Sequence, residues 1–274
     1  MHEHVIDGMR YLEAGAGWPV VLIHAFPLNA DMWRPQLARV PAGWRFIAPD
    51  LIGFTPSRPS RGGALSPGNP PLPPSGESLT MDDYARGVAR LLDALEIDEA
   101  IIGGLSMGGY ITFALFRLAP ERFSGAILAD TRPQADSDDG KKNRTRMREL
   151  LAARGVEAIA EEMLPNLLSR EADAALVASV RRIVETLPPS AIDAALGAMR
   201  ERPDSTADLA KMSFPVLVVV GDQDEVTPPP DAERMQAQLP RSRLTVIPGA
   251  GHLANLERPH EFSQALDDFL VAAM

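Results

Sequence analysis

Short apolar runs alternate along the chain with longer segments in which apolar residues recur at helical spacing. The runs are rich in Val and Ile and are bounded by Gly, Pro or polar residues, a pattern typical of buried strands. Strands separated by helices indicate a parallel sheet, because parallel neighbours need a crossover connection. Clear strands are predicted at residues 19–23, 45–48, 100–103, 125–129, 215–220 and 243–247. Weaker signals near Val5 and at 9–12 predict an antiparallel edge.

Helices with defined ends are predicted between these strands. Thr80 suits the N-cap position, with Asp83 three residues later, ahead of apolar residues at helical spacing. A second helix is expected from about residue 107 to 118, because Pro120 stops it. A third is expected at about 259–271, with apolar residues on one face. The alternation predicts the α/β class, with a mostly parallel central sheet flanked by helices.

Two regions interrupt the alternation. Residues 55–78 are dense in Pro, Gly and Ser, which predicts a long surface loop rather than a separate domain. Residues 132–212 contain no good strand and are rich in Ala, Leu, Arg and Glu, which predicts several helices. Since this segment separates two predicted strands, we expect a core formed by residues 1–131 and 213–274, with 132–212 inserted as a helical lid.

Composition narrows the range of partners. The formal net charge of −10 would repel phosphate groups, so neither nucleic acid nor an anionic membrane is expected as a partner. The absence of Cys excludes disulfides, thiolate metal sites and cysteine nucleophiles. The N-terminus lacks the pattern of a secretory signal, and the apolar runs are too short to cross a bilayer. These features predict a cytoplasmic protein and give no indication of its oligomeric state.

A candidate nucleophile lies where the strand at 100–103 meets the helix from residue 107. The segment 104–108 reads Gly-Leu-Ser-Met-Gly. A sharp strand-to-helix turn projects a serine hydroxyl into a site, and small flanking residues avoid clashes with the neighbouring backbone. The alternative is a glycine-rich turn that holds a phosphate at the helix N-terminus. The glycine spacing of a dinucleotide site and the lysine of a phosphate-binding loop are absent, so the sequence favours Ser106 as nucleophile.

With this motif, the chain resembles the α/β-hydrolase superfamily over nearly its whole length. Four further segments carry the resemblance. Residues 21–27 resemble the family's oxyanion loop after its third strand, and 50–54 resemble the turn after its fourth, while 221–228 resemble its acid loop and 249–252 its histidine loop. Each follows a predicted strand, and the order serine, acid, histidine is the one expected for this fold. The order of the motifs and the length of the lid look similar to those of serine carboxylesterases and 3-oxoadipate enol-lactonases.

The resemblance implies a role for each residue of a triad. His252 would be the base that takes the proton of Ser106, and Asp224 would fix the tautomer of the imidazole. Two other acids are candidates. Asp222 lies in the same loop, and Asp130 ends the strand at 125–129, where some hydrolases of this fold carry their acid. The alternative for Asp130 is a cap or hinge at the start of the lid.

The oxyanion donors implied by the resemblance are the backbone amides of Phe26 and Met107. The family usually has glycine where Ala25 stands, and alanine fits there only if its backbone angles are ordinary. Arg132 could reach an acidic substrate, although a solvated arginine at a hinge is the alternative. Leu28, Trp33, Met163 and Leu167 are candidates to line an apolar pocket. For Trp33, packing in the core is the alternative.

The chemistry expected from these motifs is hydrolysis of a carboxylic ester or lactone through an acyl-enzyme intermediate, with a small-molecule substrate and water as the expected partners. A serine nucleophile argues against dehalogenase or epoxide hydrolase chemistry, which the family performs with a carboxylate. No cofactor is expected, and the histidines lack the spacing of metal ligands. The alternatives on the same site are a cofactor-free perhydrolase or haloperoxidase, a carbon–carbon bond hydrolase, and a receptor-like binding protein with a slow triad.

Overall fold

The computed structural model describes residues 1–55 and 79–273. Within them the strands form one sheet in the order β1-β2-β4-β3-β5-β6-β7-β8. The strands are β1 (His2–Ile6), β2 (Met9–Gly15), β3 (Gly17–Ile23), β4 (Gly43–Pro49), β5 (Ala100–Leu105), β6 (Phe123–Ala129), β7 (Val216–Gly221) and β8 (Ser242–Ile247). β2 pairs antiparallel with β1 and β4, and the other neighbours are parallel. The predicted sheet and its antiparallel edge are confirmed, whereas the predicted loop at 55–78 lies, beyond residue 55, outside the described residues.

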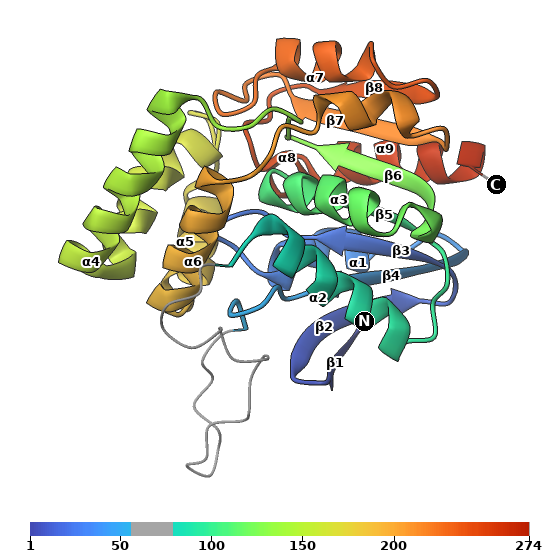
Figure 1. Ribbon diagram of the computed structural model, residues 1–274, viewed down its shortest axis with the longest axis horizontal. Coiled ribbons are helices and arrows are strands. Elements are labelled where there is room, and N and C mark those ends of the chain that lie inside the picture. The colour runs from blue at the N-terminus through green and yellow to red at the C-terminus, as the bar shows by residue number, and fades with distance from the viewer. Residues whose placement is uncertain (56–78, 274) are drawn as a thin grey trace.

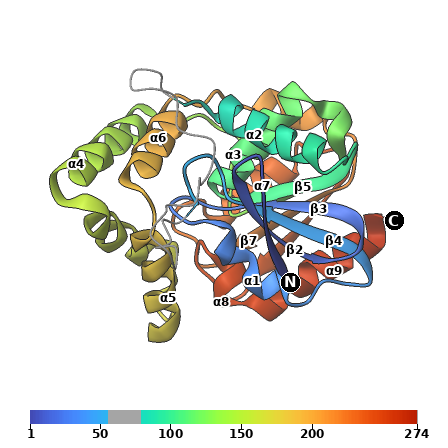
Figure 2. The ribbon, with the colours of Figure 1, turned by 90° about the horizontal axis from the view of Figure 1, so that it is seen from below.

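Helices cover both faces of the sheet. One face carries α2 (Met81–Ala94), α3 (Met107–Leu118) and α7 (Pro229–Gln236), and the other carries α1 (Arg34–Leu37), α8 (Ala254–Glu257) and α9 (Pro259–Ala273), as Figures 1 and 2 show. Short 3-10 turns lie at Ala30–Trp33, Pro120–Arg122 and Thr206–Lys211. Each face packs its own cluster of buried apolar side chains against the helices that cover it. The sheet is therefore buried on both sides, as parallel sheets generally are.

The ends of α2 and α3 follow from local signals. The Thr80 side chain accepts a hydrogen bond from the amide of Asp83, while the Asp83 carboxylate accepts one from the amide of Thr80. This reciprocal arrangement satisfies two amides that have no partner inside the helix. α3 ends at Leu118, just before Pro120, because proline cannot continue the hydrogen-bond ladder. Both helices were predicted at these positions.

Three helices that follow β6 and precede β7 along the chain stand apart from the sheet. They are α4 (Asp138–Leu167), α5 (Ala174–Glu185) and α6 (Pro189–Arg200), shown beside the sheet in Figure 1. α4 is two helices joined at a kink, since Gly155 has a φ of 76°. This group, which we call the helical insertion, was expected from the sequence at residues 132–212. Its action as a lid and the predicted domain limits stay predictions.

A buried ionic cluster fixes the base of the helical insertion. Asp136, which precedes α4, accepts hydrogen bonds from Arg144 at 3.0 Å and from Arg202 at 2.6 Å. The Arg202 guanidinium also lies 4.0 Å from the centre of the Tyr110 ring. The cluster ties the start and the end of the insertion to α3, so the insertion is anchored where it leaves the core. Among the described residues, no helix is long and apolar enough to cross a membrane.

Candidate active site

Ser106 lies at the turn between β5 and α3, where the sequence placed the nucleophile. Its φ of 56° and ψ of −112° put it outside the regions that L-residues ordinarily occupy. The turn is held because the amide of Ser106 donates to the carbonyl of Ala129 at 2.9 Å and the Thr131 hydroxyl donates to the carbonyl of Ser106 at 2.8 Å. A strained backbone conformation fixed by neighbouring contacts is a common feature of functional sites.

Close packing around this turn explains its two glycines. A Cβ on Gly104 would lie 2.7 Å from the carbonyl oxygen of Ile23, and one on Gly108 would lie 2.3 Å from the same atom. Side-chain carbons do not approach carbonyl oxygens this closely. Glycine at both positions therefore lets the first turn of α3 lie against the end of β3, beside the loop that begins at His24.

His252 and Asp224 form a buried pair. The Nδ1 atom of His252 lies 2.8 Å from Oδ2 of Asp224, and the two residues are 1% and 3% exposed. Because an ionised carboxylate can only accept, Nδ1 carries the proton in this contact. Nε2 is then the acceptor atom of the neutral ring. The structure thus pairs His252 with Asp224, which is the acid chosen from the sequence.

Several donors stabilise the charge of Asp224. Its Oδ1 accepts from the amides of Val226 at 2.7 Å and Thr227 at 3.0 Å, and its Oδ2 accepts from the Thr227 hydroxyl at 2.7 Å. Burial alone would raise the pKa of this carboxyl. The nearby charge of His252 and the hydrogen bonds from His252 and Thr227 outweigh burial and lower the pKa to about 2. Asp224 is therefore an anion throughout the neutral range.

The topology brings the three loops to one edge of the sheet. Ser106 follows β5, Asp224 follows β7 and His252 follows β8, and these strands are parallel, with β6 between β5 and β7. The carboxyl ends of parallel strands meet at the same edge, where ligands of open α/β sheets bind. A Cβ on Gly221 would lie 2.3 Å from the carbonyl oxygens of Ala250 and Gly251, so the acid and histidine loops touch backbone to backbone.

The other two candidate acids lie beside the pair. Asp222 is exposed, and its Oδ1 accepts from the amide of Gly249 at 2.7 Å. Asp130 is 1% exposed and accepts from the amide of Gly221 at 2.8 Å. Burial and the charge of Asp224 raise the pKa of Asp130 well above its usual range, against the effect of the Gly221 amide. Of the three carboxyl groups, Asp224 is the one in contact with the imidazole.

The loop after β3 is fixed by a buried histidine. His24 contacts the carbonyl of Ala25 through Nδ1 at 2.9 Å, and its Nε2 accepts from the amide of Leu51 at 3.1 Å. Burial lowers the pKa of His24 to about 4, so this ring is a neutral link between two loops. Ala25 is not among the described residues with positive φ, so alanine fits its ordinary backbone.

The two proposed oxyanion donors flank this region. Phe26 lies in the loop, where its peptide bond to Pro27 is cis. Met107 is the first residue of α3, so its amide has no acceptor within the helix. A Cβ on Gly108 would meet the carbonyl oxygens of Ile23 and His24, so this first helical turn lies directly against the start of the loop. The loop and the helix start are therefore neighbours, although the assignment of the two amides stays a prediction.

The predicted pocket residues lie in different surroundings. Leu28 and Trp33 are fully buried, and the Trp33 ring packs against Phe262 of α9 with ring centres 5.9 Å apart. Arg132 lies 3.7 Å from the Asp231 carboxylate of α7. Met163 and Leu167 lie in α4, half-buried and buried respectively. Trp33 thus packs in the core, which was the alternative to a pocket role in the sequence analysis. Contacts of these five residues with a substrate stay predictions.

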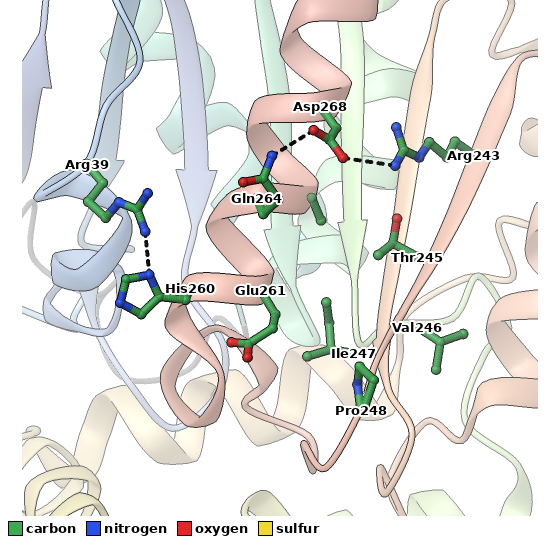
Figure 3. Close-up of a pocket in the computed structure, with 11 residues that line it drawn as sticks. Arg39, Arg243, Thr245, Val246, Ile247, Pro248, His260, Glu261, Gln264 and Asp268 are labelled. Carbon is green, nitrogen blue, oxygen red and sulfur yellow. Dashed lines mark hydrogen bonds and ion pairs between the residues drawn. The ribbon is translucent and has the colours of Figure 1, made fainter.

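His260 is separate from the candidate site. Its Nδ1 lies 2.6 Å from the guanidinium of Arg39, at the rim of a groove of about 430 Å³ between β8 and α9 (Figure 3). Arg243 and Asp268, which also line this groove, pair with each other at 3.3 Å. Across residues 1–55 and 79–273, no group of three or more His, Asp or Glu side chains could hold a metal ion.

Two contributors to the site were not singled out from the sequence. Thr227 binds Asp224 and lies 3.4 Å from Nδ1 of His252, and its position three residues after the acid was the available signal. Glu257 is buried, and its carboxylate accepts from the amide of Gly251 at 2.7 Å and from that of Ser169 at 3.0 Å. The second contact joins residues 88 positions apart, so no local pattern could reveal it.

Comparison with known proteins shows the family of the chain. The 3-oxoadipate enol-lactonase 1 of Acinetobacter baylyi is 25% identical over 92% of this chain and 88% of its own. A Synechocystis protein provisionally named a non-heme chloroperoxidase is 28% identical over 95% and 94%. A thermophilic esterase from Thermogutta terrifontis, solved with malate bound, is 36% identical with a TM-score of 0.88, covering 97% and 93%. The family described as alpha/beta hydrolase fold matches residues 19–259. This protein belongs to the α/β-hydrolase family.

Proposed function

We propose that the protein is a serine hydrolase that cleaves a carboxylic ester or lactone through an acyl-enzyme intermediate. The observation that carries the proposal is the buried contact of 2.8 Å between His252 and Asp224. It orients the imidazole with Nε2 as a base, at the sheet edge where Ser106 lies on its strained turn. The likeness to an esterase at 36% identity and to an enol-lactonase at 25% supports the same chemistry.

The first half of the reaction forms the acyl-enzyme. Nε2 of His252 takes the proton of the Ser106 hydroxyl as Oγ attacks the substrate carbonyl carbon. The tetrahedral intermediate places its negative oxygen toward the amides of Phe26 and Met107, where the N-terminal end of α3 adds positive potential. The intermediate collapses when the imidazolium gives its proton to the leaving alkoxide, and Ser106 keeps the acyl group.

The second half releases the acid. A water molecule gives a proton to Nε2 of His252 and attacks the acyl carbonyl, and the second tetrahedral intermediate expels Oγ of Ser106, which recovers the proton. Asp224 stays ionised in both halves, since its pKa lies at about 2. Its charge stabilises each imidazolium that forms, and no cofactor is needed for any step.

We also place the substrate under the helical insertion. The end of α4 contacts the histidine loop directly, because the amide of Leu253 donates to the carbonyl of Leu167 at 3.0 Å. Met163 lies one turn earlier on the same helix segment, so both side chains are candidates to line the pocket. The insertion would then cover the acyl or alcohol part of the substrate and act as a lid.

The test is turnover together with covalent labelling. A panel of nitrophenyl esters and lactones should be hydrolysed, and a fluorophosphonate probe should label the chain at Ser106. Ser106→Ala should lose both the turnover and the label, whereas Ser137→Ala, at the N-cap of α4, serves as the matched serine control and should keep them. Turnover that survives Ser106→Ala, in a protein free of contaminating esterase, would exclude this mechanism.

A second candidate activity is peroxide-dependent acyl transfer on the same residues. It is favoured by the 28% identity with the provisionally named chloroperoxidase. Hydrogen peroxide would replace water as attacker of the acyl-enzyme and release a peracid, which oxidises bromide without a metal. Peroxide-dependent bromination in acetate, measured against ester hydrolysis at the same enzyme concentration, separates the two activities. Bromination faster than hydrolysis would make perhydrolysis the main reaction.

A further inference from the structure

A third carboxyl group lies behind the His252–Asp224 pair. Asp130 follows β6, and its backbone amide donates to the carbonyl of Val219 in β7 at 2.8 Å. Its Oδ1 accepts from the amide of Gly221 at 2.8 Å, while the amide of Asp224 donates to the carbonyl of Gly221 at 3.3 Å. The carboxyl group of Asp130 and the backbone of Asp224 therefore both bind Gly221 in the acid loop, and the charge of Asp224 raises the pKa of Asp130.

The second carboxyl oxygen of Asp130 lacks a hydrogen-bond partner in the described part of the chain, which indicates that a proton lies between the two carboxyl groups. Oδ2 is buried and has no hydrogen-bond partner among the described residues. Two carboxylates cannot hydrogen-bond to each other, because neither carries a donor. A single proton between them removes this conflict and one of the two buried charges.

The surroundings decide which group holds that proton. Asp224 receives four hydrogen bonds, from the amides of Val226 and Thr227, the Thr227 hydroxyl and His252. Asp130 receives one, from Gly221. The charged groups near Asp130 are the acids Asp224 and Glu257, and both oppose its ionisation, as does burial. The negative charge therefore resides on Asp224.

We propose that Asp130 is a neutral positioning residue, whose protonated carboxyl donates to the Asp224 carboxylate and holds it against His252. The proposal rests on the triad of the proposed function. Asp130 acts through Asp224 and does not touch the reacting atoms. Its proton fixes Asp224 from the side of β6, and its neutrality leaves a single negative charge next to the imidazole.

Asp130→Asn and Asp130→Ala separate a neutral donor from an ionised acid. Asparagine keeps an oxygen for the amide of Gly221 and an N–H for Asp224, whereas alanine removes both. We expect Asp130→Ala to lower kcat/KM roughly 10- to 100-fold, and Asp130→Asn to restore most of that loss. The pH at which kcat/KM falls on its acid side should stay the same in Asp130→Asn, because no charge near His252 has been removed.

Infrared difference spectroscopy reads the proton directly. Near neutral pH, the carbonyl stretch of a protonated carboxyl group should be present in the wild-type protein and absent from Asp130→Asn. Asp268→Asn, in the exposed pair with Arg243, is the matched control and should leave that band unchanged. The proposal is overturned if Asp130→Asn leaves the band in place, shifts the acid limb to lower pH, or loses as much activity as Asp130→Ala.

The spectroscopic arm does not depend on catalysis. The band can be recorded on Ser106→Ala, which has no proposed nucleophile, and it should be the same there. Loss of the band from Asp130→Asn with turnover that survives Ser106→Ala would refute the proposed function alone. Turnover that depends on Ser106, with a band that survives Asp130→Asn, would refute the neutral Asp130 alone.

Discussion

The contact between Asp224 and His252 determines which nitrogen of the ring can act as a base. Asp224→Asn can turn an amide N–H toward Nδ1, which makes Nδ1 the acceptor and places the proton on Nε2, so the ring loses its productive tautomer. We expect kcat for a nitrophenyl ester to fall roughly 10³- to 10⁴-fold, with a small change in KM. Asp268→Asn, the same chemical change on α9, should keep wild-type kcat. Retention of more than roughly a tenth of kcat in Asp224→Asn would mean that another acid orients His252.

The turn that carries Ser106 leaves no space for a side chain at Gly108. Gly108→Ala puts a methyl group 2.3 Å from the carbonyl oxygen of Ile23, and that carbonyl belongs to the sheet and cannot move aside cheaply. We expect a loss of about 1–3 kcal/mol in the free energy of unfolding and near-complete loss of turnover.

Gly197→Ala in α6 is the matched control for this change. The nearest atom to its new methyl group would be an arginine nitrogen at 3.9 Å, and alanine favours the helix by about 0.5–1 kcal/mol over glycine. Urea denaturation of both variants checks the pair. Equal stability changes of the same sign would show that clearance at the turn is not the cause.

At the scale of elements, Glu257 joins three pieces of the molecule. Its two oxygens bind the amide of Gly251 in the histidine loop and the amide of Ser169 just after α4. Glu257→Gln can accept only one of these bonds, so one buried amide loses its partner at a cost of about 1–3 kcal/mol in stability. Since Gly251 adjoins His252, we expect kcat to fall as well, by about tenfold. Thermal unfolding and ester kinetics measure the two effects, with the exposed Glu261→Gln as control; unchanged values in Glu257→Gln would show that this bridge is dispensable.

Helices and strands with strong local signals could be predicted from the sequence, whereas a kink and the short helices could not. The sheet strands and α2, α3 and α9 were predicted because periodicity, a capping box and proline are properties of neighbouring residues. The kink at Gly155 was missed, since one glycine inside a helical pattern usually stays helical. The short α1, α7 and α8 were also not predicted, because helices this short carry little periodic signal.

In the candidate site, the residues within motifs could be predicted, whereas the contacts between distant segments could not. Ser106, Asp224 and His252 stand in loop motifs that can be recognised, and of the three candidate acids it is Asp224 that His252 contacts. The contact of Glu257 with Ser169 and the approach of Asp130 to Asp224 depend on how β6, β7 and α4 pack. Those distances follow from tertiary structure, which a single sequence does not encode in any local pattern.

At the scale of the whole molecule, a buried cation holds the antiparallel edge to the core. Arg10 of β2 is 3% exposed and binds Asp50, which follows β4, through two contacts of 3.1 Å. Its other contacts are with Glu3 of β1 at 3.2 Å and with Asp31 at 2.9 Å in the 3-10 turn after β3. Asp50 also accepts from the amide of Ala30 at 2.9 Å, so one network spans four segments of the chain.

Removing the cation of this network should destabilise the protein in a pH-dependent way. Burial raises the pKa of Asp50 to about 6, against the effect of Arg10, and Arg10→Met removes that opposition and raises the pKa further. In the unfolded chain this carboxyl ionises near its ordinary value of 3.8. Above about pH 6 the folded wild type has lost the proton of Asp50, whereas the folded variant still holds it, so the stability gap between the two widens as the pH rises above about 6.

We expect Arg10→Met to lose about 3–5 kcal/mol near neutral pH, because it leaves a buried carboxyl without its partner, and to lose less near pH 4. Arg45→Met, which breaks the more exposed pair with Glu13 in the same part of the sheet, should cost about 0–1 kcal/mol. The double variant Arg10→Met with Asp50→Asn should recover much of the loss, since no buried charge remains. Urea denaturation between pH 4 and 8 measures all three. A gap for Arg10→Met that stays constant over this range would show that the ionisation of Asp50 is not its source.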